Sequence, residues 1–424
     1  MIPWKAPSSP SPVTGEVVVP GSKSATARSY LLAAVADGPS TLRGVLNARD
    51  TELMRGGLTG LGVEFADLGP DSVRVRPPRS FRGGATIDVG LAGTVMRFLP
   101  PLAALTTPAT HFVGDPGAAA RPVAPLLGAL VALGAQVSEP HRLPFSVSGT
   151  LRSGEVSLDA SASSQFISAL LLVGARLPEG LTVTHTGDRL PSLPHIEMSV
   201  RMLAERGVPV ERPTARTWRV LPGRVSPVAE QVEPDLTNAA SLLAAAVITG
   251  GRLTTAWPEQ SLQAADTLAA ALVSFGAEIS YEGSGTSRRI TVQGPDRVRG
   301  ARLDLHEISE LTPVAAALAS VADSPSVITG VGHIRSHETD RLAALERELA
   351  GLGADIRQTD DGLEVQPALL HGGTFHTHAD HRLAHAAALV GLVVADVDLD
   401  DIGCTSKTLP DFPGLWAGLV GGAR

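Results

Sequence analysis

One short sequence motif recurs along this chain and limits the folds that the chain can adopt. In it a helical stretch ends, a glycine follows, and a strand-like tail comes next. Glycine is common just after the last turn of a helix. Chance copies of such a motif occur in any α/β protein, but the even spacing of 69 to 77 residues favours duplication of a βαβαββ-sized block. The five copies contain Gly62, Gly134, Gly207, Gly276 and Gly353.

Six helices rich in alanine and leucine are apolar nearly all round, so we expect them to be buried. A short polar sequence precedes each of them, and serine, threonine or aspartate there would be explained by helix capping alone. Buried helices that open with Lys, Arg, Gln or Glu suggest in addition that their N-termini face an anionic ligand. The helices are expected at residues 27–36, 98–105, 166–175, 239–249, 314–321 and 383–394.

The length and charge of the chain exclude several classes of protein. A chain of 424 residues is too long for one ordinary core, so two domains are expected. The net charge of -8 and the lack of a basic face argue against nucleic acid as a partner. The single cysteine, Cys404, excludes a disulfide framework. With no secretory pattern at the start and no apolar run of about 18 residues, we expect a cytoplasmic protein that does not enter a membrane.

Lysine is scarce in this chain, which draws attention to the few lysines that remain. Of 35 basic residues only three are lysines, namely Lys5, Lys23 and Lys407. Lys23 follows a strand-like run and a turn, with hydroxyls beside it and the guanidinium of Arg28 one helical turn later. Such a set can hold a phosphate or a carboxylate. It is not a nucleotide P-loop, which needs glycine directly before the lysine, where this chain has Ser22.

Other polar sequences are weaker evidence when each is taken alone. Gly93 would let a ligand approach the backbone of a helix start closely, and Arg121 opens a further helix. The sequence from 337 to 341 fits a helix cap, with threonine or aspartate as the capping residue. His381 and His385 have the spacing of a zinc pair, but the H-E-x-x-H pattern is missing and the helix is apolar, so no metal is expected.

Taken in order from Pro20 to Pro413, these motifs resemble those of the enolpyruvyl transferases, and within them the EPSP synthase family in its actinobacterial form. The resemblance implies an α/β fold of two inside-out domains, each with three βαβαββ repeats. Their buried parallel helices would point their N-termini at the cleft between domains. One domain would span residues 18–235, and the other would combine residues 1–17 with 236–424.

The resemblance also implies a reaction. The enolpyruvyl group of phosphoenolpyruvate would pass to the 5-hydroxyl of shikimate 3-phosphate with release of phosphate, through a tetrahedral intermediate, on the route to chorismate. Neither a metal nor an organic cofactor would be needed, the enzyme would act as a monomer that closes on its substrates, and glyphosate would compete with phosphoenolpyruvate. Both substrates are anions, which would explain cations gathered at helix starts in an acidic protein.

The resemblance assigns roles to individual residues. Glu310 would accept the proton of the 5-hydroxyl, Glu338 would protonate the methylene carbon, and Lys23 would assist the leaving phosphate. One carboxylate must then begin ionised and the other protonated. The residues expected to bind shikimate 3-phosphate are Lys23, Ser24, Arg28, Ser163, Ser164, Gln165, Ser192, Glu310 and His337. Those expected to bind phosphoenolpyruvate are Lys23, Gly93, Arg121, Gln165, Arg341, Arg382 and Lys407.

The chain departs from the usual family pattern at five positions, which we interpret as features of a subfamily. Glu310 replaces an aspartate, and His337 replaces a lysine, which makes part of the positive charge depend on pH. Leu91 replaces an asparagine beside Gly93, which puts that contact in doubt. The other two departures are Phe98 in place of a proline and His195 in place of a tyrosine.

Two alternatives remain open. The related UDP-N-acetylglucosamine enolpyruvyl transferases usually have asparagine after the first lysine and a reactive cysteine before the Arg-Pro pair. Here Ser24 follows Lys23, and residues 114–121 contain no cysteine. A non-catalytic relative that only binds phosphorylated molecules is the second alternative, and the presence of both Glu310 and Glu338 argues against it.

Overall fold

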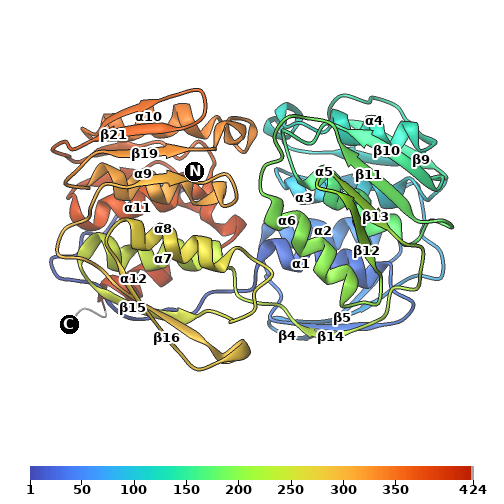
Figure 1. Ribbon diagram of the computed structural model, residues 1–424, viewed down its shortest axis with the longest axis horizontal. Coiled ribbons are helices and arrows are strands. Elements are labelled where there is room, and N and C mark those ends of the chain that lie inside the picture. The colour runs from blue at the N-terminus through green and yellow to red at the C-terminus, as the bar shows by residue number, and fades with distance from the viewer. Residues whose placement is uncertain (422–424) are drawn as a thin grey trace. The chain divides into compact units, whose positions relative to one another are not determined.

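A computed structural model describes residues 1–421, which form two compact units (Figure 1). Unit 2 is Gly21–Glu233, and unit 1 combines Met1–Pro20 with the chain from Pro234 onward. The chain therefore passes from one unit to the other twice. Each unit has its own sheets and its own buried helices.

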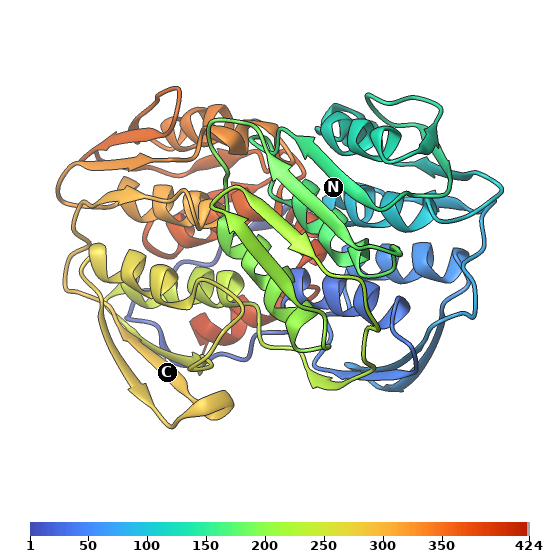
Figure 2. The same ribbon diagram turned by 45° about the vertical axis from the view of Figure 1, so that its right-hand side comes forward.

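Unit 2 contains three four-stranded sheets and six α-helices (Figure 2). Its helices are α1 (Lys23–Ala34), α2 (Arg49–Gly60), α3 (Gly93–Ala103), α4 (Ala124–Ala132), α5 (Gln165–Gly174) and α6 (Leu193–Ala204). Its strands are β3 (Ser40–Arg43), β4 (Glu64–Gly69), β5 (Ser72–Arg76), β6 (Thr86–Asp88), β7 (Thr110–Val113), β8 (Ala135–Val137), β9 (Phe145–Gly149), β10 (Gly154–Leu158), β11 (Leu181–His185), β12 (Val210–Thr214), β13 (Thr217–Val220) and β14 (Ala229–Gln231). The sheet orders are β14-β3-β5-β4, β6-β7-β9-β8 and β10-β11-β13-β12.

Unit 1 repeats this plan with one shorter sheet. Its helices are α7 (Leu236–Thr249), α8 (Ala265–Ser274), α9 (Thr312–Ser320), α10 (Arg341–Gly351), α11 (His381–Val393) and α12 (Phe412–Gly421). Its strands are β1 (Trp4–Lys5), β2 (Thr14–Glu16), β15 (Arg252–Ala256), β16 (Glu278–Glu282), β17 (Arg289–Gln293), β18 (Arg302–Asp304), β19 (Ser326–Thr329), β20 (Asp355–Gln358), β21 (Leu363–Gln366), β22 (Gly373–Phe375) and β23 (Val397–Leu399). The sheet orders are β16-β17-β15-β2, β18-β19-β21-β20 and β1-β23-β22.

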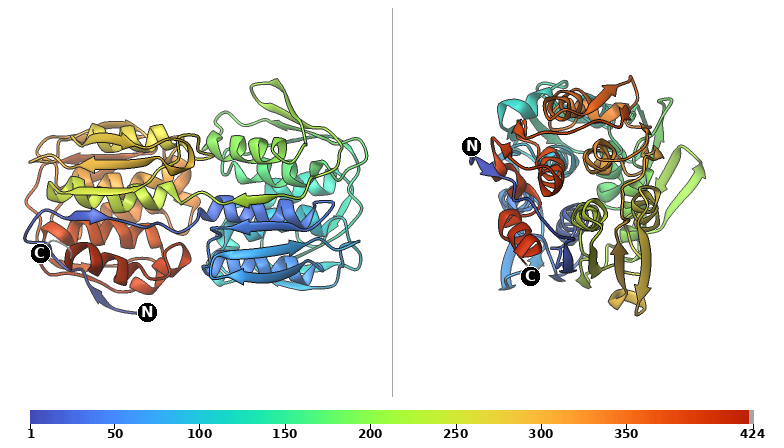
Figure 3. Two further views of the ribbon diagram at one scale, coloured as in Figure 1. Left: turned by 90° about the horizontal axis from the view of Figure 1, so that it is seen from below. Right: turned by 90° about the vertical axis from the view of Figure 1, so that its left-hand side faces the viewer.

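Each sheet has one parallel strand pair, and the remaining pairs are antiparallel. Helices α1, α3 and α5 pack on one another in unit 2, and α7, α9 and α11 do so in unit 1. The right-hand view of Figure 3 shows unit 1 with its helices nearly end-on and strands around them. These six helices are the ones that the sequence predicts as apolar nearly all round. Because they have no polar face, burial on every side removes apolar surface from water and is favourable.

The recurring glycines lie where the sequence predicts them. Each follows one of the helices α2, α4, α6, α8 and α10, and a strand follows each glycine. Their φ angles lie between +77° and +101°, a region that glycine reaches without steric cost. The glycine is therefore the residue that ends the helix and turns the chain into the next strand.

Two features of the sheets go beyond the simple repeat. The strand before α1, β2, pairs with β15 in unit 1, whereas the strand before α7, β14, pairs with β3 in unit 2. The first strands of two repeats are thus exchanged where the chain passes between units. The last repeat has only two strands of its own, and β1 from the N-terminal residues completes its sheet. Within residues 1–421 no helix combines the length and the apolarity that a membrane span requires.

Candidate active site

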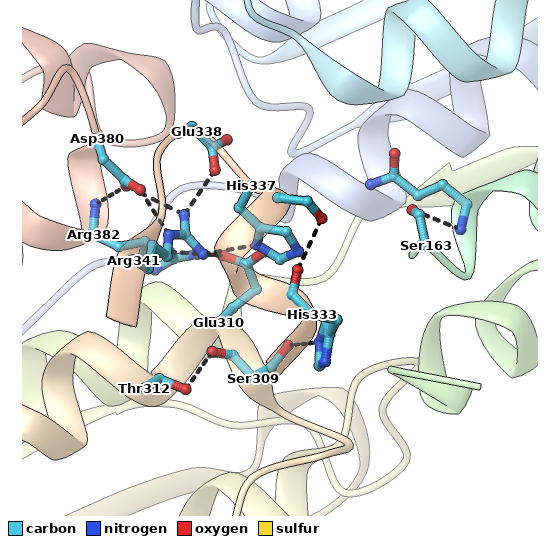
Figure 4. Close-up of polar contacts among 12 residues, drawn as sticks. Ser163, Ser309, Glu310, Thr312, His333, His337, Glu338, Arg341, Asp380 and Arg382 are labelled. Atoms are coloured by element: carbon cyan, nitrogen blue, oxygen red, sulfur yellow. Dashed lines mark hydrogen bonds and ion pairs between the residues drawn. The ribbon is translucent and has the colours of Figure 1, made fainter. Parts of the chain in front are cut away.

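Arg341 is the centre of a charged cluster in unit 1 (Figure 4). It is the first residue of α10, and its side chain is fully buried. Its Nε lies 2.6 Å from Oδ2 of Asp380, Nη1 lies 2.8 Å from Oε2 of Glu310, and Nη2 lies 2.9 Å from Oε2 of Glu338. Burial lowers the pKa of Arg341, but the three carboxylates more than reverse this and raise it. A planar guanidinium with five donors suits such a set of oxygen atoms.

Helix starts place these side chains. Asp380 caps α11 by accepting the backbone N–H of Arg382, and Asp340 caps α10 in the same manner. Glu310 belongs to the single 3₁₀ turn (Ser309–Leu311) that leads into α9. The capping that the sequence predicts near residue 340 is confirmed, with the aspartate as the cap.

Two further cations complete the cluster. Nζ of Lys407 lies 2.5 Å from Oε1 of Glu338. Nη1 of Arg382 donates to the side chain of Asn238 at 2.8 Å, and its Nε lies 3.6 Å from Oε2 of Glu310. These contacts join the first turns of α7 and α11 to the turn before α9. The positive ends of three buried helices and three cationic side chains therefore gather in one place, which favours an anionic ligand.

The two glutamates have different surroundings. The side chain of Glu310 is 32% exposed, whereas that of Glu338 is 7% exposed. Burial of the Glu310 carboxyl acts to raise its pKa, but Arg341 and His337 outweigh this and hold the pKa well below its ordinary value. Nδ1 of His337 lies 3.4 Å from Oε1 of Glu310. Glu310 is therefore ionised near neutral pH and can accept a proton.

His333 supports the turn that carries Glu310. Its Nε2 lies 2.9 Å from Oγ of Ser309, the residue before Glu310 (Figure 4). Burial and the nearby His306 lower the pKa of His333 to about 4, so its ring is neutral above that pH. His333 is not among the site residues that the sequence predicts.

Lys23 occupies the corresponding position at a helix start in unit 2. It is the first residue of α1, which Ser22 caps by accepting the N–H of Ala25 at 3.3 Å. The ammonium of Lys23 lies 3.3 Å from Oδ2 of Asp50, a buried carboxylate that the sequence analysis did not identify. The lysine side chain is 19% exposed.

Arg28 is buried in the second turn of α1 and bonds to neighbouring helices. It donates to the side chain of Ser199 at 2.8 Å, to the carbonyl of His195 at 2.9 Å and to the carbonyl of Ser24 at 3.0 Å. Its guanidinium lies over the ring of Phe98, 5.1 Å from the centroid. Burial lowers the pKa of Arg28 to about 9, so the side chain stays cationic at neutral pH. In this structure Arg28 joins α1 to α6, and its contact with substrate stays a prediction.

Gly93, Arg121 and Gln165 are linked through neighbouring groups. Nη1 of Arg121 donates to the carbonyl of Leu91 at 2.7 Å, a backbone contact that does not depend on which side chain stands at residue 91. A Cβ atom built on Gly93 would lie 3.0 Å from Nη2 of Arg121, so any other residue here would require the guanidinium to shift by a few tenths of an ångström. Oε1 of Gln165 accepts from the buried Arg97 at 2.9 Å. These contacts fix the positions of two predicted ligand groups.

The remaining predicted residues of unit 2 are serines at helix starts. Oγ of Ser163 accepts the N–H of Gln165 at 3.3 Å (Figure 4). Ser164 is the residue before α5. Ser192 precedes α6 with φ +51°, a left-handed conformation that is rare and strained in residues other than glycine. Strained backbone residues are common at functional sites, and Ser192 is one of the residues expected to contact substrate.

Four polar partners of the predicted residues are not among the site residues that the sequence predicts. All four lie at or near helix starts. Neighbouring residues at these helix starts are predicted ligands, so the position could also have indicated these four. They are Asp50, Arg97, Asn238 and Asp380.

Among residues 1–421 no three His, Cys, Asp or Glu side chains are arranged to hold a metal ion. The histidines whose spacing resembles a zinc pair lie on the buried helix α11 and meet edge to face at 6.0 Å. The ring of His385 stacks on that of Phe412 at 4.8 Å. Its two nitrogens have no hydrogen-bond partner within the described part of the chain. The ring therefore packs in the core as an aromatic side chain does.

Replacing His385 by phenylalanine is expected to make the protein more resistant to acid. Burial, Arg382 and Arg341 hold the pKa of His385 well below 6.5, whereas the unfolded histidine titrates near 6.5. The neutral ring therefore contributes fully above pH 6.5, and stability is lost as the pH falls below it, by up to about 1.4 kcal/mol per pH unit. The free energy of unfolding, measured with urea at pH values on both sides of 6.5, should fall less steeply with decreasing pH for His385→Phe than for the parent. The exposed His371→Gln is the control, and an unchanged slope in His385→Phe would contradict the expectation.

Comparison with known proteins identifies relatives over the whole chain. The family model for EPSP synthase (3-phosphoshikimate 1-carboxyvinyltransferase) matches residues 7–416. A 3-phosphoshikimate 1-carboxyvinyltransferase of Mycobacterium ulcerans (strain Agy99) is 49% identical over 433 residues, covering 99% of this chain and 98% of that protein. Two structures of EPSP synthase from Acinetobacter baumannii, each 22% identical, match with TM-scores of 0.80 and 0.78 and cover 97% and 99% of this chain, and 97% and 98% of their own. At that identity they show the same fold.

Proposed function

Because this chain belongs to the EPSP synthase family, we propose that it transfers the enolpyruvyl group of phosphoenolpyruvate to the 5-hydroxyl of shikimate 3-phosphate, with release of phosphate, on the pathway to chorismate. The proposal is carried by the cluster in which Arg341, Arg382 and Lys407 surround two glutamates at the N-termini of buried helices. Such a cluster can bind an anion and exchange protons with it. The roles proposed for its residues are those that the family resemblance implies, and these contacts support them.

Glu310 is proposed as the base. Its carboxylate is ionised and partly exposed, so it can receive the proton of the 5-hydroxyl as the oxygen attacks phosphoenolpyruvate. Ser309 and His333 hold the turn beneath it. The longer side chain of glutamate, compared with the aspartate usual in the family, extends the reach of this base.

Glu338 is proposed as the group that protonates the methylene carbon. In this structure its carboxylate contacts Arg341 and Lys407, and adjacent cations favour the ionised form of a carboxylate. Because Arg341 is fully covered, an anion can reach it only by displacing one of the groups bonded to it, of which Glu338 is one. The phosphate or carboxylate of phosphoenolpyruvate would thus take the cations from Glu338 and favour its protonated form. Binding of this substrate would prepare the acid for its step.

Unit 2 is proposed to supply the remaining ligands. Lys23, Ser24, Arg28, Ser163, Ser164, Gln165 and Ser192 would bind shikimate 3-phosphate together with Glu310 and His337. Gly93, Arg121, Gln165 and Lys23 would contribute to phosphoenolpyruvate binding together with Arg341, Arg382 and Lys407. Lys23, at the start of α1, would also assist the leaving phosphate.

Phosphate release from the purified protein is the experiment that tests this function. The protein is given phosphoenolpyruvate with shikimate 3-phosphate, and in parallel with UDP-N-acetylglucosamine as acceptor. Release only with shikimate 3-phosphate is expected. Release with the nucleotide sugar would favour the related transferase, and folded protein that releases phosphate with neither acceptor would favour a non-catalytic binding protein.

We also propose that the two compact units are the two domains of the enzyme and that it acts as a monomer in the cytoplasm without binding nucleic acid. The net charge of -8 supports the last point, because it repels a polyanion. Sedimentation of the purified protein, alone and with duplex DNA, would test the monomer and the absence of binding.

Replacing Gly93 by alanine is expected to weaken inhibition by glyphosate, which would compete with phosphoenolpyruvate. The new methyl group would lie 3.0 to 3.2 Å from the guanidinium of Arg121, so the arginine or the bound ligand must move by a few tenths of an ångström. Inhibition curves and the KM for phosphoenolpyruvate would be compared with those of Gly128→Ala, a position with open space around it. Unchanged inhibition in Gly93→Ala would reject this geometry.

A further inference from the structure

The loop between β22 and α11 has an unusual backbone. His378 and Ala379 are consecutive residues with φ +52° and +55°, and neither is a glycine. Each residue held in the left-handed region costs about 1 kcal/mol or more, and it persists only where the surrounding structure imposes it. The next residue is Asp380, which caps α11 and binds the guanidinium of Arg341. A strained segment therefore ends on a carboxylate of the charged cluster.

Glu348 holds one side of this loop. It lies on α10, and its side chain is 5% exposed. Its Oε2 accepts the backbone N–H of His376 at 2.9 Å, and its Oε1 lies 2.8 Å from Nε2 of His378. Burial raises the pKa of Glu348, but the bonds from His376, His378 and Arg347 hold it below its ordinary value. An ionised carboxylate thus bonds to both ends of a three-residue stretch.

Asp400 holds the same loop from the end of β23. Its Oδ1 accepts the backbone N–H of Thr377 at 2.8 Å and the hydroxyl of Thr377 at 2.9 Å. Its Oδ2 lies 3.2 Å from Nδ1 of His376. With Glu348 bonded to residues 376 and 378, the loop is fixed at three consecutive residues before it reaches Asp380.

Helix α10 meets this segment at two points along its length. Arg341 and Glu348 are seven residues apart, which is close to two turns, so both side chains lie on the same face of the helix. Arg341 binds Asp380 at the end of the segment, and Glu348 binds the loop before it. Neither the catalytic proposal nor the predicted ligand sets assign a role to Glu348.

We propose that Glu348 is a positioning residue for the phosphoenolpyruvate site. By holding residues 376–378 against α10, it imposes the left-handed backbone that places the Asp380 carboxylate on Arg341. The orientation of Arg341 depends on this contact, and so does that of Arg382, whose backbone N–H the Asp380 carboxylate accepts at the start of α11. The inference rests on the proposed function, because it assumes that these two arginines bind phosphoenolpyruvate.

Steady-state kinetics of Glu348→Ala test the proposal. The KM for phosphoenolpyruvate is expected to rise about tenfold or more, since a small misplacement of binding groups can cost up to about 100-fold. The KM for shikimate 3-phosphate should change little. Glu346→Ala is the matched control, because Glu346 lies on the same helix and accepts a backbone and a side-chain bond from Gln358 in β20, away from the loop. It should lose stability without a change in either KM.

A second substitution separates positioning from general loss of structure. Ala379 is exposed, and glycine adopts its left-handed conformation without steric cost. Ala379→Gly alone should leave kcat and both KM values near those of the parent. In the Glu348→Ala background it should recover part of the affinity for phosphoenolpyruvate. If the KM for phosphoenolpyruvate rises in Glu348→Ala and the added Ala379→Gly does not lower it, Glu348 does not act through the left-handed loop.

The Nε–H resonance of Arg341, assigned with Arg341→Lys, gives a readout that does not depend on turnover. It should shift in Glu348→Ala and stay in place in Glu346→Ala, because Nε donates to Asp380. A parent protein without turnover would refute the proposed function, and the resonance would still test the positioning. An unmoved resonance, or an unchanged KM for phosphoenolpyruvate in an active enzyme, would overturn the proposal for Glu348.

Discussion

Replacing Glu310 by glutamine is expected to lower kcat by about 100- to 10,000-fold, the usual contribution of a general base. Glutamine has nearly the same shape but cannot accept the proton of the 5-hydroxyl. The carboxylate of Glu310 is ionised because Arg341 and His337 hold its pKa well below the ordinary value. Binding of both substrates should survive, since the amide oxygen can still accept a bond from Arg341.

Two measurements check this result. Phosphate release gives kcat, and calorimetry with shikimate 3-phosphate gives its affinity for the parent and for Glu310→Gln. Glu364→Gln is the control, because it removes a surface ion pair with Arg357 at 2.6 Å and such pairs contribute little. Turnover near that of the parent in Glu310→Gln would eliminate this glutamate as the base.

Replacing Arg382 by alanine is expected to weaken phosphoenolpyruvate binding by about 2 to 5 kcal/mol, the cost of losing one partner of a buried charge pair. The affinity for shikimate 3-phosphate should change far less. The side chain of Arg382 is 5% exposed and is held by Asn238, so its charge is little screened by water. Binding of each substrate is measured separately, with Arg357→Ala as a surface control.

Arg341→Ala is expected to weaken phosphoenolpyruvate binding as well, with an added loss of stability. It leaves Glu310, Glu338 and Asp380 without their common partner, and an unpaired buried charge costs about 3 to 5 kcal/mol. Its binding constants are therefore read together with its thermal midpoint, and Arg382→Ala gives the cleaner test. Equal weakening of both substrates in Arg382→Ala would contradict the assignment of these arginines to phosphoenolpyruvate.

Much of the candidate site could be predicted because the start of a helix depends on a few neighbouring residues in the sequence. Residues such as Lys23, Arg341 and Arg382 are each in the first turn of a helix, next to a capping residue that sequence patterns identify. Asp380 caps such a start, and capping explained it fully until its contact with Arg341 was seen. Asn238 lies in the first turn of α7, and only its contact with Arg382 shows what its side chain does. A cap and a ligand holder use the same residue types, so only distances between separate helices distinguish them.

The roles of buried histidines show the opposite case. His333 bonds to Ser309 across 24 residues, and His385 stacks on Phe412 in another helix. No pattern along the chain indicates such pairings, because the partners are set by how helices pack. The same holds for Glu348, which bonds to a loop with an unusual left-handed backbone that no sequence pattern indicates.

The sequence by itself determined the repeat, the six buried helices, the glycines that end the outer helices and the cations at helix starts. Each depends on periodicity, capping or backbone freedom within a few residues. Only the tertiary structure decided that β2 and β14 are exchanged between repeats, and that Arg341 binds Asp380 as well as both glutamates. Strand pairing and buried ion pairs join residues far apart in the chain. Their choice depends on the free energy of packing whole elements together, which no local stretch of sequence contains.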